Sequence, residues 1–103
     1  MNRANNNQRE GYGSMLYANK NKYNGFWKED KFDGWGQFSD ENNNTYMGEW
    51  HKGRKEGYGV STHADGSMYK GNWKNNLKHG IGRETLLDGS VYKGEFVNDD
   101  WNG

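Results

Sequence analysis

Three histidines and one serine-containing segment are the residues whose types could support catalysis or metal binding. His51, His63 and His79 share no common spacing, and the chain has no cysteine, so no metal site is predicted. Ser61, His63 and Asp65 are the residue types of a hydrolytic triad. On one strand, however, alternate side chains stand side by side about 6.6 Å apart and cannot relay a proton in line. We expect no catalytic residue, no metal ligand and no cofactor.

Paired glycines are the second motif that could indicate a chemical function, in this case phosphate binding. Gly57/Gly59 and Gly80/Gly82 resemble the opening of a phosphate-binding loop, but neither pair has the third glycine and the following helix that such a loop needs. The pairs instead recur at one interval of 23 residues, at Gly11/Gly13, Gly34/Gly36, Gly57/Gly59 and Gly80/Gly82, with Gly103 at the start of a fifth copy. A fixed period of about 20 to 50 residues is the sequence signature of a repeat protein.

An aromatic phrase keeps the same interval and indicates β-strands. It has the form Tyr-x-Gly-x-Trp, or Phe in the last copy, and begins at Tyr23, Tyr46, Tyr69 and Tyr92. Tyr46, Gly48 and Trp50 occupy alternate positions and therefore share one face of a strand. We expect this glycine, and both glycines of each Gly-x-Gly pair, to leave notches that aromatic rings of neighbouring hairpins fill.

Turn signals separate the predicted strands. Gly53 follows Trp50 in a polar run. Its equivalents in the other copies are Asp30, Asn76 and Asp99. Glycine, asparagine and aspartate tolerate a positive φ, so a left-handed turn residue is predicted at this position. Asp65-Gly66 marks a second turn in each unit, because Asp-Gly between alternating runs is a strong hairpin signal.

These signals together predict an all-β fold, an elongated single-layer ribbon of antiparallel β-hairpins. About four 23-residue units would give a ribbon on the order of 40 Å long, since neighbouring strands lie about 4.8 Å apart. Residues 1–10 are Asn-rich and without apolar periodicity, and we expect them to be a flexible lead-in. Residues 11–103 form the predicted array, with a partial unit before Tyr23 and a truncated last unit that starts at Tyr92.

The composition excludes several classes of function. Lysine and arginine together number 14, as do aspartate and glutamate, so the net charge is zero and nucleic-acid binding is not expected. Hydrophobic residues make up only 30% of the chain but aromatic residues 16%, which favours a thin ordered array over disorder. No stretch of about 18 apolar residues and no signal-peptide core is present, so we expect a cytoplasmic protein.

The phrase Tyr-x-Gly-x-Trp, the Gly-x-Gly pair and a closing Asp-Gly-Ser, repeated every 23 residues, resemble the MORN repeat (membrane occupation and recognition nexus). The resemblance is close over residues 46–68 and 69–91. Residues 23–45 depart from it at Asp30 and at Asn42-Asn43-Asn44, where weaker turns are expected. The resemblance implies a non-catalytic scaffold whose ribbon holds a partner segment, often a helix, in a groove, within a ciliary or cytoskeletal assembly. A regulatory fragment of a larger MORN-containing protein is an alternative.

Large apolar side chains outside the repeated phrase are the candidate partner-binding residues. The residue between the paired glycines, which is Tyr12, Trp35, Tyr58 or Ile81, points away from the glycine face. Tyr17 and Phe38 follow the glycines in phase and lie on the other face. A single sheet with apolar residues on both faces and no second layer suggests a docking surface. The alternative is that sheet twist and long neighbouring side chains cover these residues.

Two further interactions are weighed as alternatives. Lys52, Arg54 and Lys55 could form a cationic edge that binds anionic phospholipid, although acidic residues in equivalent loops would dilute its field. A solvated loop face is the other interpretation of these cations. The array also begins and ends half-way through a hairpin, and open sheet edges can pair with another chain. We therefore expect either a homo-oligomer through these edges or a piece of a longer array.

Overall fold

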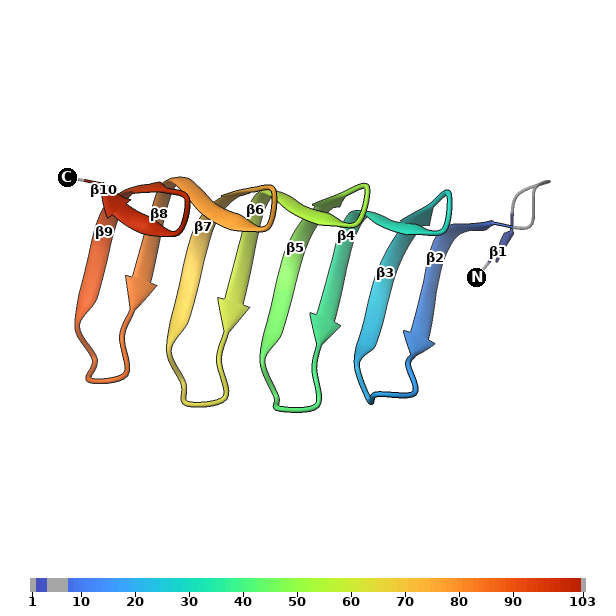
Figure 1. The fold of residues 1–103 in the computed structure, drawn as a ribbon, viewed down its shortest axis with the longest axis horizontal. Helices are drawn as coiled ribbons and strands as arrows, with labels where there is room; N and C mark the ends of the chain where they lie inside the picture. The colour runs from blue at the N-terminus through green and yellow to red at the C-terminus, as the bar shows by residue number, and fades with distance from the viewer. Residues whose placement is uncertain (1, 4–7, 103) are drawn as a thin grey trace.

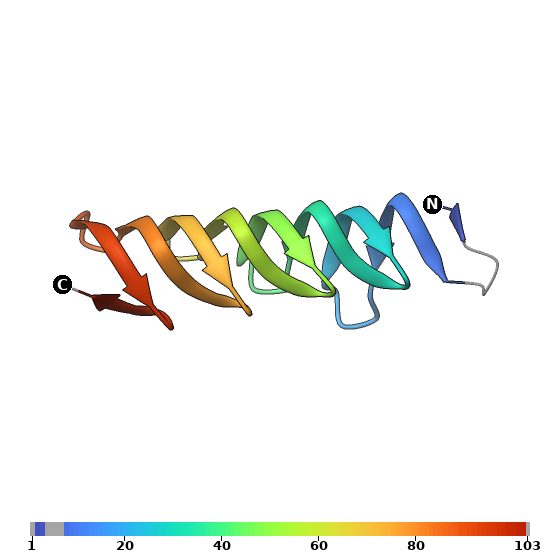
Figure 2. The same ribbon diagram turned by 90° about the horizontal axis from the view of Figure 1, so that it is seen from above.

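The structure is a computed structural model, and it describes residues 2–3 and 8–102. The described residues form ten antiparallel strands that pair in chain order in one sheet, and they contain no helix. The strands are β1 (Asn2–Arg3), β2 (Arg9–Leu16), β3 (Lys22–Lys28), β4 (Lys31–Ser39), β5 (Thr45–His51), β6 (Arg54–Thr62), β7 (Met68–Lys74), β8 (Leu77–Thr85), β9 (Val91–Val97) and β10 (Asp100–Asn102). The ribbon measures 48 × 25 × 16 Å, and its strands wind like the turns of a spiral (Figures 1 and 2). The predicted all-β hairpin ribbon is confirmed.

Two strands begin before the predicted start of the array at Gly11. Arg9 and Glu10 belong to β2, and they pair with Arg3 and Asn2 of β1. The remainder of the predicted flexible lead-in, except Gln8, lies outside the described residues. Along the described chain, the repeating sheet therefore starts at Arg9 and not at Gly11.

Two kinds of turn alternate along the ribbon, and Figure 1 shows them on opposite edges. The turns along the upper edge have two residues, both with positive φ, as at Lys52 (49°) and Gly53 (81°). The equivalent pairs are Glu29/Asp30, Asn75/Asn76 and Asn98/Asp99. Two consecutive left-handed residues define a type I′ turn, whose twist matches that of the flanking strands. The predicted left-handed position is thus confirmed, and in Figure 1 the longer loops lie along the lower edge.

The longer loops use a side chain to hold the turn. In the loop after β6, Gly66 has a φ of 95° and Asp65 accepts hydrogen bonds from the backbone and hydroxyl of Ser67 at 2.8 and 2.7 Å. These bonds lower the pKa of the Asp65 carboxyl. In the loop after β4, Asn43 takes the left-handed conformation with a φ of 66°. Asp40 accepts hydrogen bonds from the backbone of residues 42 and 44 there.

The two glycines of each Gly-x-Gly pair have different roles. Gly57 has a φ of 75° and lies at a bulge, where the pairing between β5 and β6 shifts by two residues. Gly59 pairs with Gly48, and a β-carbon on Gly59 would overlap the ring of Tyr46. A notch filled by an aromatic ring is therefore present at the second glycine, but the ring comes from the other strand of the same hairpin and not from a neighbouring hairpin. The expectation of a notch is wrong for the first glycine, which is required for a left-handed backbone at a bend.

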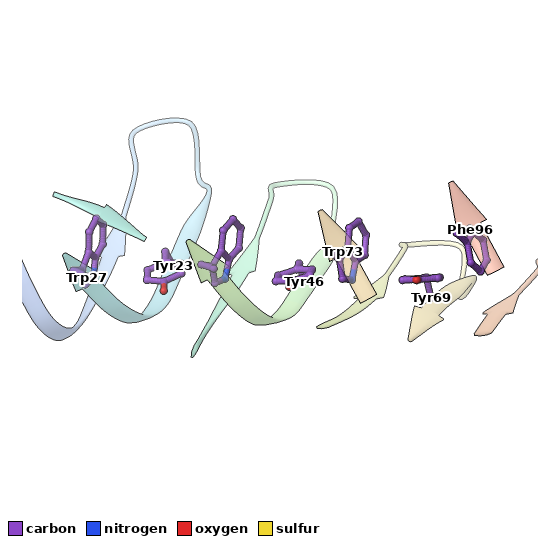
Figure 3. Packing of buried hydrophobic residues seen from close by; sticks show 7 residues of the cluster. Tyr23, Trp27, Tyr46, Tyr69, Trp73 and Phe96 are labelled. Atoms are coloured by element: carbon purple, nitrogen blue, oxygen red, sulfur yellow. The ribbon is translucent and has the colours of Figure 1, made fainter. Parts of the chain in front are cut away.

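One continuous row of edge-to-face aromatic rings forms the core (Figure 3). The ring of Tyr46 lies 4.9 Å from that of Trp50 in its own unit and 5.3 Å from that of Trp73 in the next. The Tyr46 hydroxyl donates to the carbonyl of Glu49 at 2.8 Å, and the Trp50 indole donates to the carbonyl of Gly36 at 3.1 Å. Neighbouring units are thus held together by ring contacts and, where the phrase ends in tryptophan (Trp27, Trp50 and Trp73), by one buried indole hydrogen bond.

One further position of the repeat places its side chain over these rings, and the residue type at this position differs between units. Residues 9, 32, 55, 78 and 101 occupy it. The ring of Phe32 stacks on that of Tyr23 at 3.7 Å, and the ring of Trp101 stacks on that of Tyr92 at 4.5 Å. The Lys55 ammonium lies 5.2 Å from the Tyr46 ring centroid. A planar or cationic group therefore closes the core in units of very different sequence.

Candidate functional site

The structure divides the six predicted partner-binding residues between two faces of the sheet. Tyr12, Trp35, Tyr58 and Ile81 lie on the face opposite the buried rings, which we call the outer face. All four side chains are exposed. Tyr17 follows the end of β2 and lines a hollow with Trp27 and Phe32, and Phe38 packs against the core; both side chains are half-buried. The six residues therefore do not form one site.

The outer face carries a line of exposed apolar side chains that we call the outer row. It consists of Tyr12 (60% exposed), Phe26 (45%), Trp35 (47%), Met47 (43%), Tyr58 (46%) and Ile81 (65%). Sequence reasoning missed Phe26 and Met47. Both stand beside a glycine within the Tyr-x-Gly-x-Trp phrase, so strand alternation alone would have placed them on the outer face.

The composition of the outer face changes along the ribbon. At the N-terminal end the rings of Tyr12 and Phe26 touch edge to face, with centroids 5.4 Å apart. Further along, the apolar residues alternate with polar ones, because Tyr58 pairs with Asn72 and Ile81 pairs with Glu95. The N-terminal half is thus the more continuous apolar surface.

Three cations lie directly beside one another at the C-terminal end of the outer face. Lys70 of β7 pairs with Arg83 of β8, and Arg83 pairs with Lys93 of β9. We call these three residues the basic row. Together with Tyr58 and Ile81 they line a hollow of about 400 Å³. Aromatic, aliphatic and cationic groups therefore converge on one part of this face.

The ring face has hollows of a different character. Two adjoining hollows, of about 260 and 320 Å³, are both lined by Lys55, Ser61 and His63. Burial lowers the pKa of the Lys55 ammonium, and no carboxylate of the described residues forms an ion pair with it. In the next unit, Lys78 is paired with Glu84 at 2.7 Å. Most of the residues that line these hollows have polar or charged side chains, although the rings of Phe38, Tyr46 and Trp73 also contribute to them.

Ser61, His63 and Asp65 form no hydrogen bond with one another among the described residues. Ser61 is buried at 7% exposure, whereas His63 is exposed. The carboxylate of Asp65 accepts two hydrogen bonds from Ser67 within the same turn. Within the described chain, no three acidic or histidine side chains are placed to hold a metal ion. The part of the chain that the structure describes contains no helix of the length and hydropathy needed to cross a membrane.

The three cations predicted for lipid binding do not form one exposed cluster. Lys52 lies in a type I′ turn and Arg54 at the start of β6, and both are exposed. Lys55 instead lies over the rings of Tyr46 and Trp73, at 5.2 and 4.9 Å from their centroids. Three cations on neighbouring strands lie instead on the outer face, in the basic row.

An open antiparallel sheet of equivalent hairpins, with a one-layer aromatic core and an exposed apolar row, defines a β-repeat array. The sequence profile of the MORN repeat matches residues 5–22, 23–45, 46–68 and 69–91. The chain therefore belongs to the MORN-repeat family. MORN repeats occur in scaffold and membrane-binding proteins, and they are a non-catalytic type of repeat. Comparison with curated proteins gives no significant match.

Proposed function

We propose that the protein is a non-catalytic scaffold that binds a helical segment of a partner protein along the outer row. The observation that carries this proposal is the exposure of six large apolar side chains on one face of a single-layer sheet. Exposed apolar surface of this kind is typical of docking sites. The hollows on the ring face are a weaker candidate, because charged and polar side chains line them.

The spacing of the outer row fits a helix that crosses the strands. Trp35, Tyr58 and Ile81 occupy one position in three successive units. Two strands advance about 9.6 Å along the ribbon, and seven residues of an α-helix advance about 10.5 Å. A helix with apolar side chains at every seventh position can therefore place one near each unit, which is the helix-in-groove mode of recognition.

Alanine substitution on the outer row tests the proposal. Affinity purification with the wild-type chain would select partners, and each purified partner would then be titrated against the variants. The Tyr12→Ala, Trp35→Ala and Tyr58→Ala triple variant is expected to lose at least tenfold in affinity. Leu87→Ala is the control, since Leu87 is 70% exposed but lies in a loop away from the row. Equal affinity of the triple variant and the wild type, with both chains folded, would exclude the outer row as the docking site.

A further inference from the structure

The basic row is a feature of two units and is not required by the fold. The positions equivalent to Lys70 and Lys93 are Asn24 and Met47 in the earlier units. Those equivalent to Arg83 are Ser14, Gln37 and Val60. All these residues lie in one cross-strand line, which runs from Ser14 of β2 to Lys93 of β9. The line is therefore neutral through its first five strands and cationic through its last three.

The strand register places the three cations where they are expected to repel one another in the free protein. Side chains directly opposite on neighbouring antiparallel strands have β-carbons about 4.5–5.5 Å apart, and like charges there are destabilising. Arg83 has such a neighbour on both sides. No ion pair joins Lys70, Arg83 or Lys93 to a carboxylate within the part of the chain that the structure describes. Glu95 shares their face, but its carboxylate accepts a hydrogen bond from Asn102 at 2.7 Å.

The hollow beside the basic row combines apolar side chains with the three cations. It is lined by Tyr58 and Ile81 as well as by the three cations. A ligand that fills it presents an apolar group next to negative charge. The three strands that carry the cations span about 9.6 Å, and helix residues seven apart lie about 10.5 Å from each other. A helix with carboxylates at two such positions, and a third carboxylate three or four residues after the first, could therefore place one carboxylate near each cation.

We propose that the basic row binds carboxylates of the docked protein segment, so that the partner is an amphipathic helix with an acidic end. This inference rests on the proposed function and adds to it the chemistry and the polarity of the partner. The acidic end of the helix lies over β7 to β9, where Lys70, Arg83 and Lys93 are exposed. Its apolar side chains face the outer row towards β2, where the rings of Tyr12 and Phe26 meet.

An acidic protein segment fits this surface better than an anionic membrane does. Attachment to a membrane generally uses clusters of about four to eight basic residues spread over one surface. Here the cationic part of the cross-strand line is confined to three residues beside a hollow, and the chain as a whole has no net charge. Carboxylates on one helix can meet all three cations at once, while apolar side chains on the same helix reach the hollow.

Selection from a library of displayed peptides tests the proposal without a known partner. The peptides have random sequence and a length of about 16 residues, roughly 24 Å if helical. They are selected on the wild type, on a variant with Lys70, Arg83 and Lys93 changed to Gln, and on a control with Lys20, Lys22 and Lys28 changed to Gln. The control removes the same charge from exposed positions near the other end of the ribbon. We expect Asp and Glu to be enriched at one end of the peptides selected by the wild type and the control, and the basic-row variant to lose this enrichment.

The possible results separate this inference from the proposed function. Selection of apolar peptides with no acidic bias by the wild type would overturn the inference and leave the scaffold proposal standing. Failure to select any sequence that depends on the outer row would overturn both. Equal loss of acidic bias in the control would assign the effect to overall charge and refute a site at the basic row. Binding to vesicles of phosphatidylserine and phosphatidylcholine that is lost only in the basic-row variant, without selection of acidic peptides, would assign the site to lipid instead.

The melting temperature of the free protein gives a readout that needs no ligand. Arg83→Gln removes the central charge, so the variant is expected to melt at a higher temperature than the wild type at low ionic strength, with the difference vanishing at high salt. Lys22→Gln is the single-site control and is expected to cause no such rise. An unchanged or lower melting temperature for Arg83→Gln at low salt would contradict the repulsion on which the inference depends.

Discussion

The glycine that faces each buried tyrosine should be difficult to replace, because a side chain there would overlap the tyrosine ring, and Gly59→Ala tests this. A β-carbon at Gly59 would overlap the hydroxyl end of the Tyr46 ring. That ring is 2% exposed and lies between Trp50 and Trp73. Gly59 does not have a positive φ, so the added methyl group acts through steric overlap and not through backbone strain.

The structure gives the size of the expected effect. Overpacking of a tight core costs about 1–3 kcal/mol. If the Tyr46 ring moves, its hydroxyl bond to Glu49, worth about 1 kcal/mol, is weakened. The two edge-to-face contacts of the ring contribute about 0.5–1.5 kcal/mol each. We expect the free energy of unfolding to fall by about 3 kcal/mol, which lowers the melting temperature by about 12 °C or more in a domain of this size.

Thermal and urea unfolding, followed by circular dichroism, measure this effect against a matched control. Gly66→Ala adds the same methyl group at a φ of 95° with no atom within 4 Å of it. Its cost is backbone strain alone, about 1–2 kcal/mol. In a Tyr46→Leu background, Gly59→Ala should cost much less than in the wild type, because the smaller side chain leaves room. Equal costs for Gly59→Ala and Gly66→Ala, or full additivity with Tyr46→Leu, would refute the steric argument.

Three other perturbations test the core and its covering position. Trp50→Ala should lower the free energy of unfolding by about 3–5 kcal/mol in urea titrations, because the indole is 7% exposed and links two units. Ser61→Glu should raise it by roughly 1 kcal/mol, because it gives Lys55 the carboxylate that Glu84 gives Lys78, whereas Ser61→Gln should not. Burial raises the pKa of Tyr69 to about 12, so the folded state keeps a proton that the unfolded state releases above pH 10. Stability should therefore fall between pH 10.5 and 12, and urea midpoints that stay constant over this range would contradict it.

The repeat interval was enough to predict the fold because it constrains every level of the structure at once. Alternation placed Tyr46, Gly48 and Trp50 on one face, and the turn residues fixed where each strand ends. Gly53 and its equivalents then took the left-handed conformation expected of them. Since each unit packs only on its neighbours, the fold contains no contacts between distant units that would have to be predicted separately.

The binding surfaces were only partly predictable, because they depend on register between strands. Sequence reasoning placed Trp35 and Tyr58 on the face opposite the glycines, and the structure places them there. It could not show that Lys70 and Arg83 stand directly opposite each other, because a bulge near Gly80 shifts the pairing by two residues. Nor did it recognise Lys55 as a cover for aromatic rings, since neither Phe32 nor Trp101 at the same position suggests a common role.

A single-layer array separates stability from recognition in a way that a globular domain does not. The ring face holds the core, so residues such as Tyr46 and Gly59 are fixed by packing in every unit. The outer face contributes little to that core, and its residues can change from unit to unit without loss of fold. The like charges of Lys70 and Arg83, which stand directly opposite each other on β7 and β8, are even expected to oppose the stability of the free chain. A row of like charges on a face that packing does not constrain is the arrangement that the proposed acidic partner would neutralise on binding, so the loss of this charge should weaken binding without weakening the fold.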